Sequence, residues 1–250
     1  MAASPVSRIS QAWPDRVEVR GRDLANDLMG RVGFTEYFHL LLTGREPTED
    51  QRFFLDVLLV AIAEHGMMPT NVAARMTLAA DPGSLQGAVA AGILGCGPVI
   101  LGTADECAKL LERARTSGES PHEIASDVRR SGAKAPGFGH PLHRPVDPRA
   151  ERILELADEH GVSGDHVVLA RAFKDAVAEA WGRPLTMNVS MPIAAVMLDL
   201  GFPSSAVKAV PILARTASLL AHLAEEHEHP IGFLMASHAE EAIAYEPPPG

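Results

Sequence analysis

Gly137-Phe-Gly-His-Pro-Leu-His-Arg-Pro-Val-Asp-Pro-Arg149 is the stretch from which the rest of the sequence can be interpreted. Its two glycines and three prolines exclude the interior of a helix or strand, so it predicts a shaped loop. Arg144 and Arg149 keep their charge, and their planar guanidinium groups match carboxylate or phosphate oxygens. His140 and His143 can each donate a proton or a hydrogen bond near neutral pH. The loop therefore predicts an anion-binding site, and the alternative is a surface turn held by an internal Arg–Asp pair.

The composition narrows the classes of partner. The 250-residue chain has 22 basic and 32 acidic residues, a formal net charge of −10, and its basic residues are dispersed. Because no cationic stripe is visible, nucleic acid is not expected as a partner. The two cysteines imply no disulfide framework, and we expect a cytoplasmic location. Residues 1–15 lack the apolar segment of a signal peptide, and the longest apolar run, 53–63, is too short to span a bilayer.

Hydrophobic spacing and helix-ending signals predict a largely helical chain. Few aromatic residues and many Ala and Leu residues favour helices over strands. Gly44 is typical of a helix end, and Thr48 with Gln51 has the capping-box pattern of a helix start. Asp147 is a candidate N-cap. The predicted helices cover residues 34–42, 48–64, 69–80, 84–94, 103–115, 147–159, 167–181 and 204–226, and one more begins at 121.

The remaining segments carry weaker signals. Residues 1–16 are expected to be loosely ordered, and 17–23 alternate apolar and charged residues as in one short strand or an extended arm. Pro211 is expected to kink or break the helix over 204–226, because proline lacks the N–H that a helix interior needs. The proline-rich C-terminal tail is expected to be extended.

Histidines outside the loop have less specific surroundings. His65 lies between two predicted apolar helices, where a histidine more often caps a helix than takes part in catalysis. His222, Glu226, His227 and His229 superficially resemble a metal cluster. Their spacing does not converge on one helix face as in a His-Glu-x-x-His motif. We interpret the histidines as cations near a helix C-terminus, and no metal is expected.

Several stretches resemble the citrate synthase superfamily, in order along the chain. The loop over residues 137–149, here called the opening loop, has the family's Gly-aromatic-Gly-His run followed by Asp-Pro-Arg. The sequences Arg20-Gly-Arg-Asp23 and Leu40-Leu-Leu-Thr-Gly-Arg-Glu-Pro-Thr48 resemble the amino-terminal part of the family's large domain. The stretch from Pro184 to Pro203 matches a further segment. Because the chain is short, it is most similar to the citryl-CoA lyase-like branch.

The resemblance implies an all-α, two-domain fold. The large domain would comprise residues 1–103 and 191–250, and the small domain residues 104–190. The active site would lie in the cleft between them, and two copies would form a homodimer. The implied partners are small molecules, namely an acyl-CoA and a carboxylate.

The same resemblance assigns substrate contacts by position. His140 and His65 would hold the substrate's hydroxyl or carbonyl oxygen and act in catalysis. Arg149 and Arg215 would clamp carboxylates, with Asn188 as a further substrate contact. The residues alone agree for Arg215, because an arginine in an otherwise apolar helix face needs an anionic partner. A structural carboxylate is the alternative partner.

Coenzyme A, as the acyl-CoA substrate, is the implied cofactor. Its phosphates and adenine would meet Arg144 and the turn formed by Gly137, Phe138 and Gly139. This assignment agrees with the interpretation of the loop as a cationic anion site.

Two positions depart from the family pattern. Ser190 stands where the family has the aspartate that removes a methyl proton from acetyl-CoA, and a neutral serine is a poor base. Val99, Ile100 and Leu101 stand where the family has a histidine that stabilises the enol. Loss of a positioned base or an oxyanion donor commonly costs about 10²–10⁴-fold in rate. Condensation should therefore be severely impaired.

Cleavage of a 3-hydroxy-acyl-CoA starts instead with removal of a hydroxyl proton, which His140 or His65 could perform. The departing enolate could take a proton from water, relayed by Ser190. The sequence therefore favours a coenzyme A-dependent carbon–carbon lyase that acts on citryl-CoA or a related 3-hydroxy-acyl-CoA. The alternatives are a non-catalytic or regulatory acyl-CoA-binding protein and a citrate synthase-type acyltransferase.

Overall fold

Helices make up most of the fold, which a computed structural model describes for residues 5–248. This confirms the predicted all-α class. The helices in the described residues are α1 (Phe34–Thr43), α2 (Glu49–Ala63), α3 (Pro69–Ala80), α4 (Leu85–Leu94), α5 (Thr103–Thr116), α6 (Pro121–Arg130), α7 (Pro148–Glu159), α8 (Asp165–Trp181), α9 (Ser190–Asp199), α10 (Ala209–Glu228) and α11 (Gly232–Ala242). The shorter elements are β1 (Ser10–Ala12), β2 (Val17–Val19), β3 (Arg22–Asp23), a π-helical turn η1 (Leu24–Leu28) and a 3-10 turn η2 (Ser204–Ala206).

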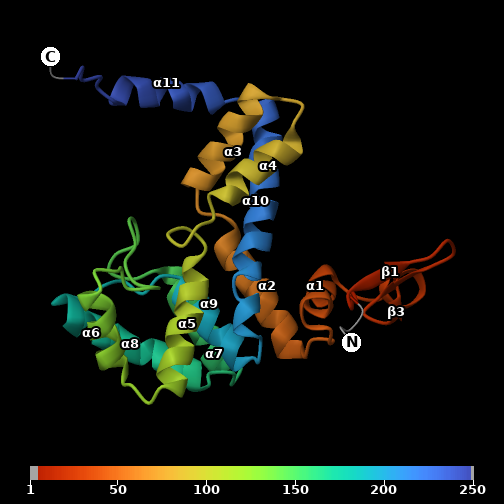
Figure 1. Ribbon diagram of the computed structural model, residues 1–250, viewed down its shortest axis with the longest axis horizontal. Helices are drawn as coiled ribbons and strands as arrows, with labels where there is room; N and C mark the ends of the chain where they lie inside the picture. Colours follow the sequence, from red (N-terminus) through yellow and green to blue (C-terminus); the bar gives the residue numbers. More distant parts are fainter. Residues whose placement is uncertain (1–4, 249–250) are drawn as a thin grey trace.

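The helices fall into two groups in space. Helices α5 to α9 gather at one end of the molecule, and α10 rises away from them beside α2, α3 and α4 (Figure 1). Helix α11 projects from the far end of α10, and α1 with the strands lies to the side (Figure 1). The opening loop, which joins α6 to α7, lies in the first group.

Local signals set the helix ends as the sequence predicts. Gly44 ends α1 in a left-handed conformation, with φ of 76°, and its N–H donates to the Leu40 carbonyl at 2.8 Å. At the start of α2, the Gln51 N–H donates to the Thr48 hydroxyl at 3.2 Å. The Thr48 N–H donates to the Gln51 side chain at 2.9 Å. These reciprocal bonds satisfy N–H groups that lack partners within the helix.

The amino-terminal segment is more ordered than expected. Strand β1 lies within the segment predicted to be loose, and it pairs antiparallel with β2, placing Ser10 opposite Val19. Residues 17–23 form two strands, β2 and β3, where one strand or arm was expected. Gly21, with φ of 80°, lies in the turn between them. The sheet is held because Val19 packs with Leu28 and Leu40 in a small apolar cluster.

Helix α9 lies at the centre of the core. All but the last of its residues are buried, and it packs against α5, α7 and α8. The apolar cluster around it continues without interruption from Phe54 in α2 to Ala214 in α10. This cluster crosses the predicted domain limits at 103 and 191, and those limits remain a prediction.

Helix α10 does not show the break expected at Pro211, and it belongs to an apolar stretch that is long enough to cross a membrane. Pro211 occupies its first turn, where a missing N–H costs nothing, so it neither kinks nor breaks the helix. The stretch Ser204–Glu228 is long and apolar enough to cross a membrane, but half of its apolar window, 50%, is buried against the rest of the protein, as in a core helix.

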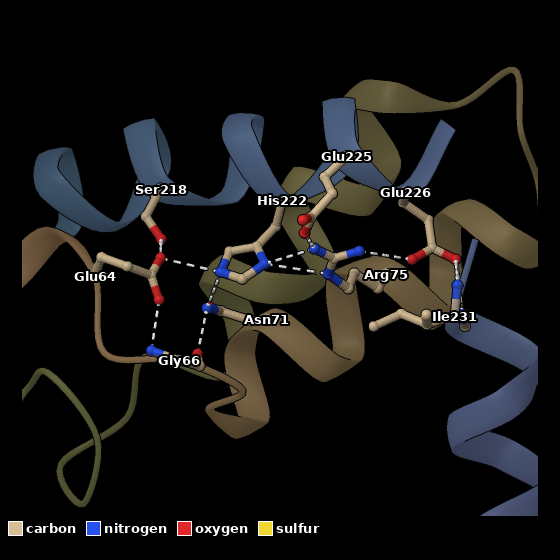
Figure 2. A network of polar contacts seen from close by, with 10 residues as sticks. Glu64, Gly66, Asn71, Arg75, Ser218, His222, Glu225, Glu226 and Ile231 are labelled. Carbon is tan, nitrogen blue, oxygen red and sulfur yellow. Dashed lines mark hydrogen bonds and ion pairs between the residues drawn. The ribbon is translucent and has the colours of Figure 1, made fainter. Parts of the chain in front are cut away.

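A buried arginine joins α3 to α10. The Arg75 side chain is fully buried and donates to the Glu226 carboxylate at 2.9 Å and also to Glu225. The second oxygen of Glu226 accepts the N–H groups of Ile231 and Gly232, which turn the chain into α11 (Figure 2). Arg75 therefore stabilises both the α3–α10 contact and the start of α11.

Replacement of Arg75 tests this role. Arg75→Ala should lower the free energy of unfolding by about 3–5 kcal/mol, because it leaves the buried Glu226 carboxylate without its cation. The matched control is Arg152→Ala on α7, which removes an exposed pair with Glu155 and Glu159 and should cost at most about 1 kcal/mol. Urea denaturation of the three proteins measures both differences, and equal losses would contradict the proposed role of Arg75.

Candidate active site

The opening loop is fastened to the segment that precedes α9. The Gly139 N–H donates to the Thr186 carbonyl at 2.7 Å, and the Asn188 N–H donates to the Gly137 carbonyl at 2.8 Å. The Asn188 side chain in turn donates to the Gly139 carbonyl at 3.0 Å. Gly137 has φ of 77°, and a Cβ there would lie 2.8 Å from the sulfur of Cys107. Only glycine therefore allows this close approach.

Asp147 anchors the other end of the loop. Its side chain is fully buried and accepts the backbone N–H of Arg149 as the N-cap of α7. The Arg149 guanidinium donates to both of its oxygens, at 3.0 and 2.9 Å, and the Val189 N–H donates at 3.2 Å. Burial acts to raise the pKa of Asp147, but the bonds from Arg149 and its charge lower that pKa overall. The internal Arg–Asp pair of the alternative interpretation thus exists.

Arg149 nevertheless remains available to a ligand. Its side chain is 21% exposed and lines a cavity of about 150 Å³. The same cavity is lined by the other predicted substrate and catalytic residues, which come from four separate segments. They are His65, His140, Asn188, Ser190 and Arg215. The fold therefore brings these predicted residues together, although their roles remain predictions.

Arg215 reaches this cavity from α10 as a buried cation. It is 2% exposed, and its Nη1 donates to the side-chain oxygen of Asn71 at 2.9 Å. Its Nε is buried without a hydrogen-bond partner among residues 5–248. Burial lowers the pKa of Arg215, but an arginine keeps its charge in proteins. The charge of Glu64 acts on Arg215 and favours its charged form, but no ion pair joins Arg215 to a carboxylate in the described chain. The geometry therefore suits an incoming anion.

The two cavity histidines differ in which nitrogen is free. The Nδ1 of His140 accepts the N–H groups of Leu142 and His143 at 3.1 and 2.9 Å, so the neutral ring carries its proton on Nε2. His65 instead has its Nε2 3.1 Å from the Nε2 of His143, and its buried Nδ1 has no partner in the described residues. Burial is the first cause that lowers the pKa of both His65 and His140. His140 is therefore arranged as a donor, and His65 can accept a proton.

The three histidines lie close enough to be examined as a metal site. One nitrogen of each of His65, His140 and His143 lies within 4.8 Å of the others. The arrangement does not favour a cation, however. Nδ1 of His140 is occupied by two N–H donors, so coordination through Nε2 would require an imidazolate. The Arg149 guanidinium also lies 3.5 Å from that Nε2.

Glu64 holds the turn that presents His65. Its carboxylate accepts the N–H groups of His65 and Gly66 at 2.8 and 2.6 Å. It also accepts bonds from Ser218 at 2.5 Å and from Nε2 of His222 at 3.0 Å (Figure 2). Burial acts to raise the pKa of Glu64, but the bond from Ser218 and the two N–H groups lower it overall. The turn is thus fixed to α10.

This network was missed by sequence reasoning. His222 lies within α10 rather than at its end, and its Nδ1 accepts a bond from Arg75 at 3.1 Å (Figure 2). Its interpretation as a cation at a helix C-terminus is therefore wrong, and the neighbouring Glu226 pairs with Arg75 as an anion. A signal was present, because Ser218, His222 and Glu226 recur every four residues on one face of an apolar helix.

A larger cavity of about 790 Å³ adjoins the first. The two share the wall formed by Val99, Gly139, His140 and other residues, and Phe138 lines only the larger one. Lys134, which sequence reasoning missed, lines this cavity and forms no ion pair with a residue between 5 and 248. The size and mixed lining suit a small organic ligand.

The predicted coenzyme A contacts are distributed unevenly. Phe138 and Gly139 line the larger cavity, and Gly137 lies directly before them in the same turn. Arg144 is exposed and lines neither cavity. Its contact with a ligand remains a prediction.

The departures noted in the sequence make one side of the small cavity apolar. Ile100 and Leu101 line it together with Ile62 and Met68. Leu101 has φ of 64°, an uncommon conformation for a residue with a side chain. Ser190, 8% exposed, also lines the cavity at the start of α9. No carboxylate is among the residues that line the cavity in the described part of the chain.

Comparison with known proteins gives consistent relatives. A family model described as "Citrate synthase, C-terminal domain" matches residues 18–232. The structure of a citryl-CoA lyase from Hydrogenobacter thermophilus is 27% identical, with a TM-score of 0.88, covering 99% of this chain and 96% of that chain. An ATP citrate lyase from Methanosaeta concilii in complex with (3S)-citryl-CoA shares the fold at 20% identity, with a TM-score of 0.82, covering 100% of this chain and 42% of that chain.

The match to curated relatives is partial in length. Citrate synthase from Heyndrickxia coagulans is 29% identical over 203 residues, which are 79% of this chain and 53% of that protein. The chain thus spans about half the length of the curated relatives it matches.

Asp147 provides a test of the loop's anchoring. Asp147→Asn should keep the cap of α7 but lower the free energy of unfolding at pH 7 by about 3 kcal/mol, because the buried pair loses its anion. The folded-state pKa of Asp147 is lowered, so its stabilising effect is present above an unfolded pKa of about 3.9 and is lost as pH falls through the folded value. The difference between variant and wild type should therefore shrink below about pH 4.

Thermal and urea unfolding at pH 7 and at pH 3 measure this dependence. Asp175→Asn, at an exposed position on α8, is the control and should change stability little at either pH. A deficit of Asp147→Asn that stays constant over this range would show that the charge of Asp147 does not support the fold.

Proposed function

Because the chain belongs to the citrate synthase family, we propose that it is a coenzyme A-dependent lyase that cleaves a carbon–carbon bond in citryl-CoA or a related 3-hydroxy-acyl-CoA. The observation that carries this proposal is the small cavity itself. It combines two arginines and two differently oriented histidines, and no carboxylate base lines it among the described residues. The similarity to a citryl-CoA lyase over nearly its whole length supports the same choice.

Arg149 and Arg215 are proposed to bind the carboxylates of the substrate. Arg149 is fixed by Asp147 on one side of its guanidinium, and Arg215 is fixed by Asn71. Both approach the cavity with charge already in place, so an anionic substrate restores part of the solvation that Arg215 lost on burial. The Asn188 side chain lines the same cavity and completes the proposed substrate contacts.

The cavity lacks two groups on which condensation depends. Condensation needs a base against the weakly acidic methyl group of acetyl-CoA, and Ser190 offers a neutral hydroxyl there. It also needs a donor for the enolate oxygen, and Ile100 and Leu101 are aliphatic. Cleavage begins at the substrate's hydroxyl group, where the histidines supply a base. Its bond-breaking step releases the same enolate, and the aliphatic residues at 100 and 101 give that enolate no donor either.

Cleavage can be assigned to the two histidines. We propose that Nδ1 of His65 takes the proton of the 3-hydroxyl group. The oxygen then becomes the carbonyl of an oxo acid as the adjacent carbon–carbon bond breaks, and that bond's electrons pass into the acyl enolate. Nε2–H of His140 donates to the oxygen as its charge develops. The enolate takes a proton from water held by Ser190, which gives acetyl-CoA or its homologue.

The larger cavity is proposed to hold the coenzyme A portion of the substrate. Phe138 and Gly139 would contact it from the loop, and Lys134 supplies a cation for a phosphate group. Arg144 lies on the exposed side of the same loop and would have to move to take part.

Two further properties are proposed, a homodimeric assembly from the family and a cytoplasmic location from the two cysteines. Exposed apolar side chains support an assembly. On α11, which projects from the body, Phe233 is 70% and Leu234 is 54% exposed (Figure 1).

A non-catalytic acyl-CoA-binding function is the second candidate. The observation that favours it is the replacement of both enolate-handling positions by Ser190 and by aliphatic residues at 100 and 101. The retained pair of histidines favours catalysis.

The lyase proposal predicts turnover of a 3-hydroxy-acyl-CoA. Purified protein incubated with citryl-CoA and a panel of 3-hydroxy-acyl-CoAs should release an acyl-CoA and an oxo acid, identified by mass spectrometry. His140→Ala should lower kcat/KM by about 10²–10³-fold, because it removes a donor to the developing oxyanion. Lys174→Ala on the exposed face of α8 is the control and should leave turnover unchanged. Binding without turnover for every compound, together with no effect of His140→Ala, would favour the non-catalytic alternative.

The missing base predicts the failure of condensation. Acetyl-CoA and oxaloacetate should release no free coenzyme A above background in a thiol assay. Ser190→Asp should raise this release, because it returns a carboxylate to the cavity, whereas the neutral Ser190→Asn should not. Rapid release by the wild-type protein would instead identify a synthase.

A further inference from the structure

The contact between His65 and His143 has no role in the cleavage steps proposed above. Their Nε2 atoms lie 3.1 Å apart, so one nitrogen must carry a proton and the other must accept it. The rings meet edge to face, with centroids 5.2 Å apart. His143 is part of the opening loop and does not line the small cavity, whereas His65 does. The pair therefore connects the cavity to a residue outside its lining.

The orientation of the pair follows from the atom that faces the substrate. If His65 is to accept a hydroxyl proton at Nδ1, its neutral ring must carry the existing proton on Nε2. That proton then points at Nε2 of His143, which must be unprotonated, with the His143 proton on Nδ1. This arrangement leaves no two hydrogens or two lone pairs facing each other across the 3.1 Å contact.

We propose that His143 is a proton relay for His65, taking the Nε2 proton of His65 as His65 Nδ1 takes the hydroxyl proton of the substrate. The inference rests on the proposed lyase function. His143 does not touch the reacting atoms in this scheme, so it acts as a positioning and relay residue through His65.

Charge is the physical reason for a relay. The groups that influence the pKa of His65 are Arg149, His143, Asp147 and Arg215. The ring of His140 is also nearby, and the Glu64 carboxylate accepts the backbone N–H of His65. The two arginines disfavour a second cation in the cavity, and burial and Arg149 lower the pKa of His65. Transfer of the Nε2 proton moves the positive charge outward to His143. The Asp147 carboxylate also favours a positive charge on His143, and the pKa of Asp147 is itself lowered in part by His143.

The protons balance over one turnover. The hydroxyl proton moves to Nδ1 of His65, and the Nε2 proton of His65 moves to Nε2 of His143. Water held by Ser190 protonates the enolate and leaves hydroxide. The hydroxide recovers the proton from Nδ1 of His65, and His143 returns its proton to Nε2. The pair ends as it began, and no oxidant or further reactant is needed.

The tautomers can be measured without substrate. In protein labelled with ¹⁵N at histidine and treated with EDTA, long-range ¹H–¹⁵N spectra should show His65 protonated at Nε2 and His143 protonated at Nδ1. A coupling between the two Nε2 atoms across the hydrogen bond should disappear in His143→Gln. The opposite tautomers, or the absence of the pair, would overturn the proposal, as would stoichiometric Zn²⁺ binding by all three histidines.

Activity separates a relay from a merely structural role. His143→Gln and His143→Ala should lower kcat about 10–100-fold with KM nearly unchanged, a smaller loss than removal of the base itself. Added imidazole should restore part of the rate of His143→Ala, since it can accept the Nε2 proton, and should not restore His65→Ala to the same extent. The relay is refuted, and the lyase function stands, if the wild type cleaves a substrate and His143→Gln is fully active. The same holds if imidazole restores no activity to His143→Ala. If no compound is cleaved by wild type, the lyase function fails, and the nitrogen tautomers still decide whether the pair exists.

Discussion

The buried carboxylate of Asp147 is the constraint on which the site depends. A carboxylate without exposure to water needs a full set of partners, because its desolvation costs several kcal/mol. Its partners come from the start of α7, from the guanidinium of Arg149 and from the N–H of Val189 before α9. The requirement therefore fixes the loop to two elements, the start of α7 and the segment before α9. The other end of the loop is held separately, because the Gly139 N–H donates to Thr186 and the Gly137 carbonyl accepts from Asn188.

Much of the helical framework was predictable because its signals are local. Gly44 and the Thr48–Gln51 pair act through bonds to residues within four positions of themselves, so the sequence contains the whole interaction. Strand β1 was missed because its order comes from pairing with β2 rather than from its own pattern. Pro211 was misjudged for the related reason that its effect depends on where the helix begins, and the sequence pattern did not fix that position.

The residues of the site could be predicted from the sequence, but the partners that orient and charge-balance them could not. Family resemblance named His65, His140 and Arg215, and the fold brings them to one cavity. The orientation of each depends on a partner that pattern reasoning does not reveal. Arg215 is held by Asn71, 144 positions away in sequence, and Glu64 binds Ser218 across 154 positions. The polar stripe on α10 indicated that such partners exist, but it did not identify them.

For the proposed function, the charges of the cavity couple anion binding to proton transfer. Arg149 is paired with Asp147, whereas Arg215 has only the neutral Asn71 as its direct partner in the described chain. Beyond Asn71, the Glu64 carboxylate acts on Arg215 only through its charge, without a direct ion pair. A substrate carboxylate is attracted because it can bind the Arg215 guanidinium directly. The guanidinium charge also opposes protonation of the imidazole rings. A histidine here acts as a base only when the anionic substrate is bound or when the new charge can leave through a neighbour. Anion binding and proton removal are thus coupled by the same two guanidinium groups.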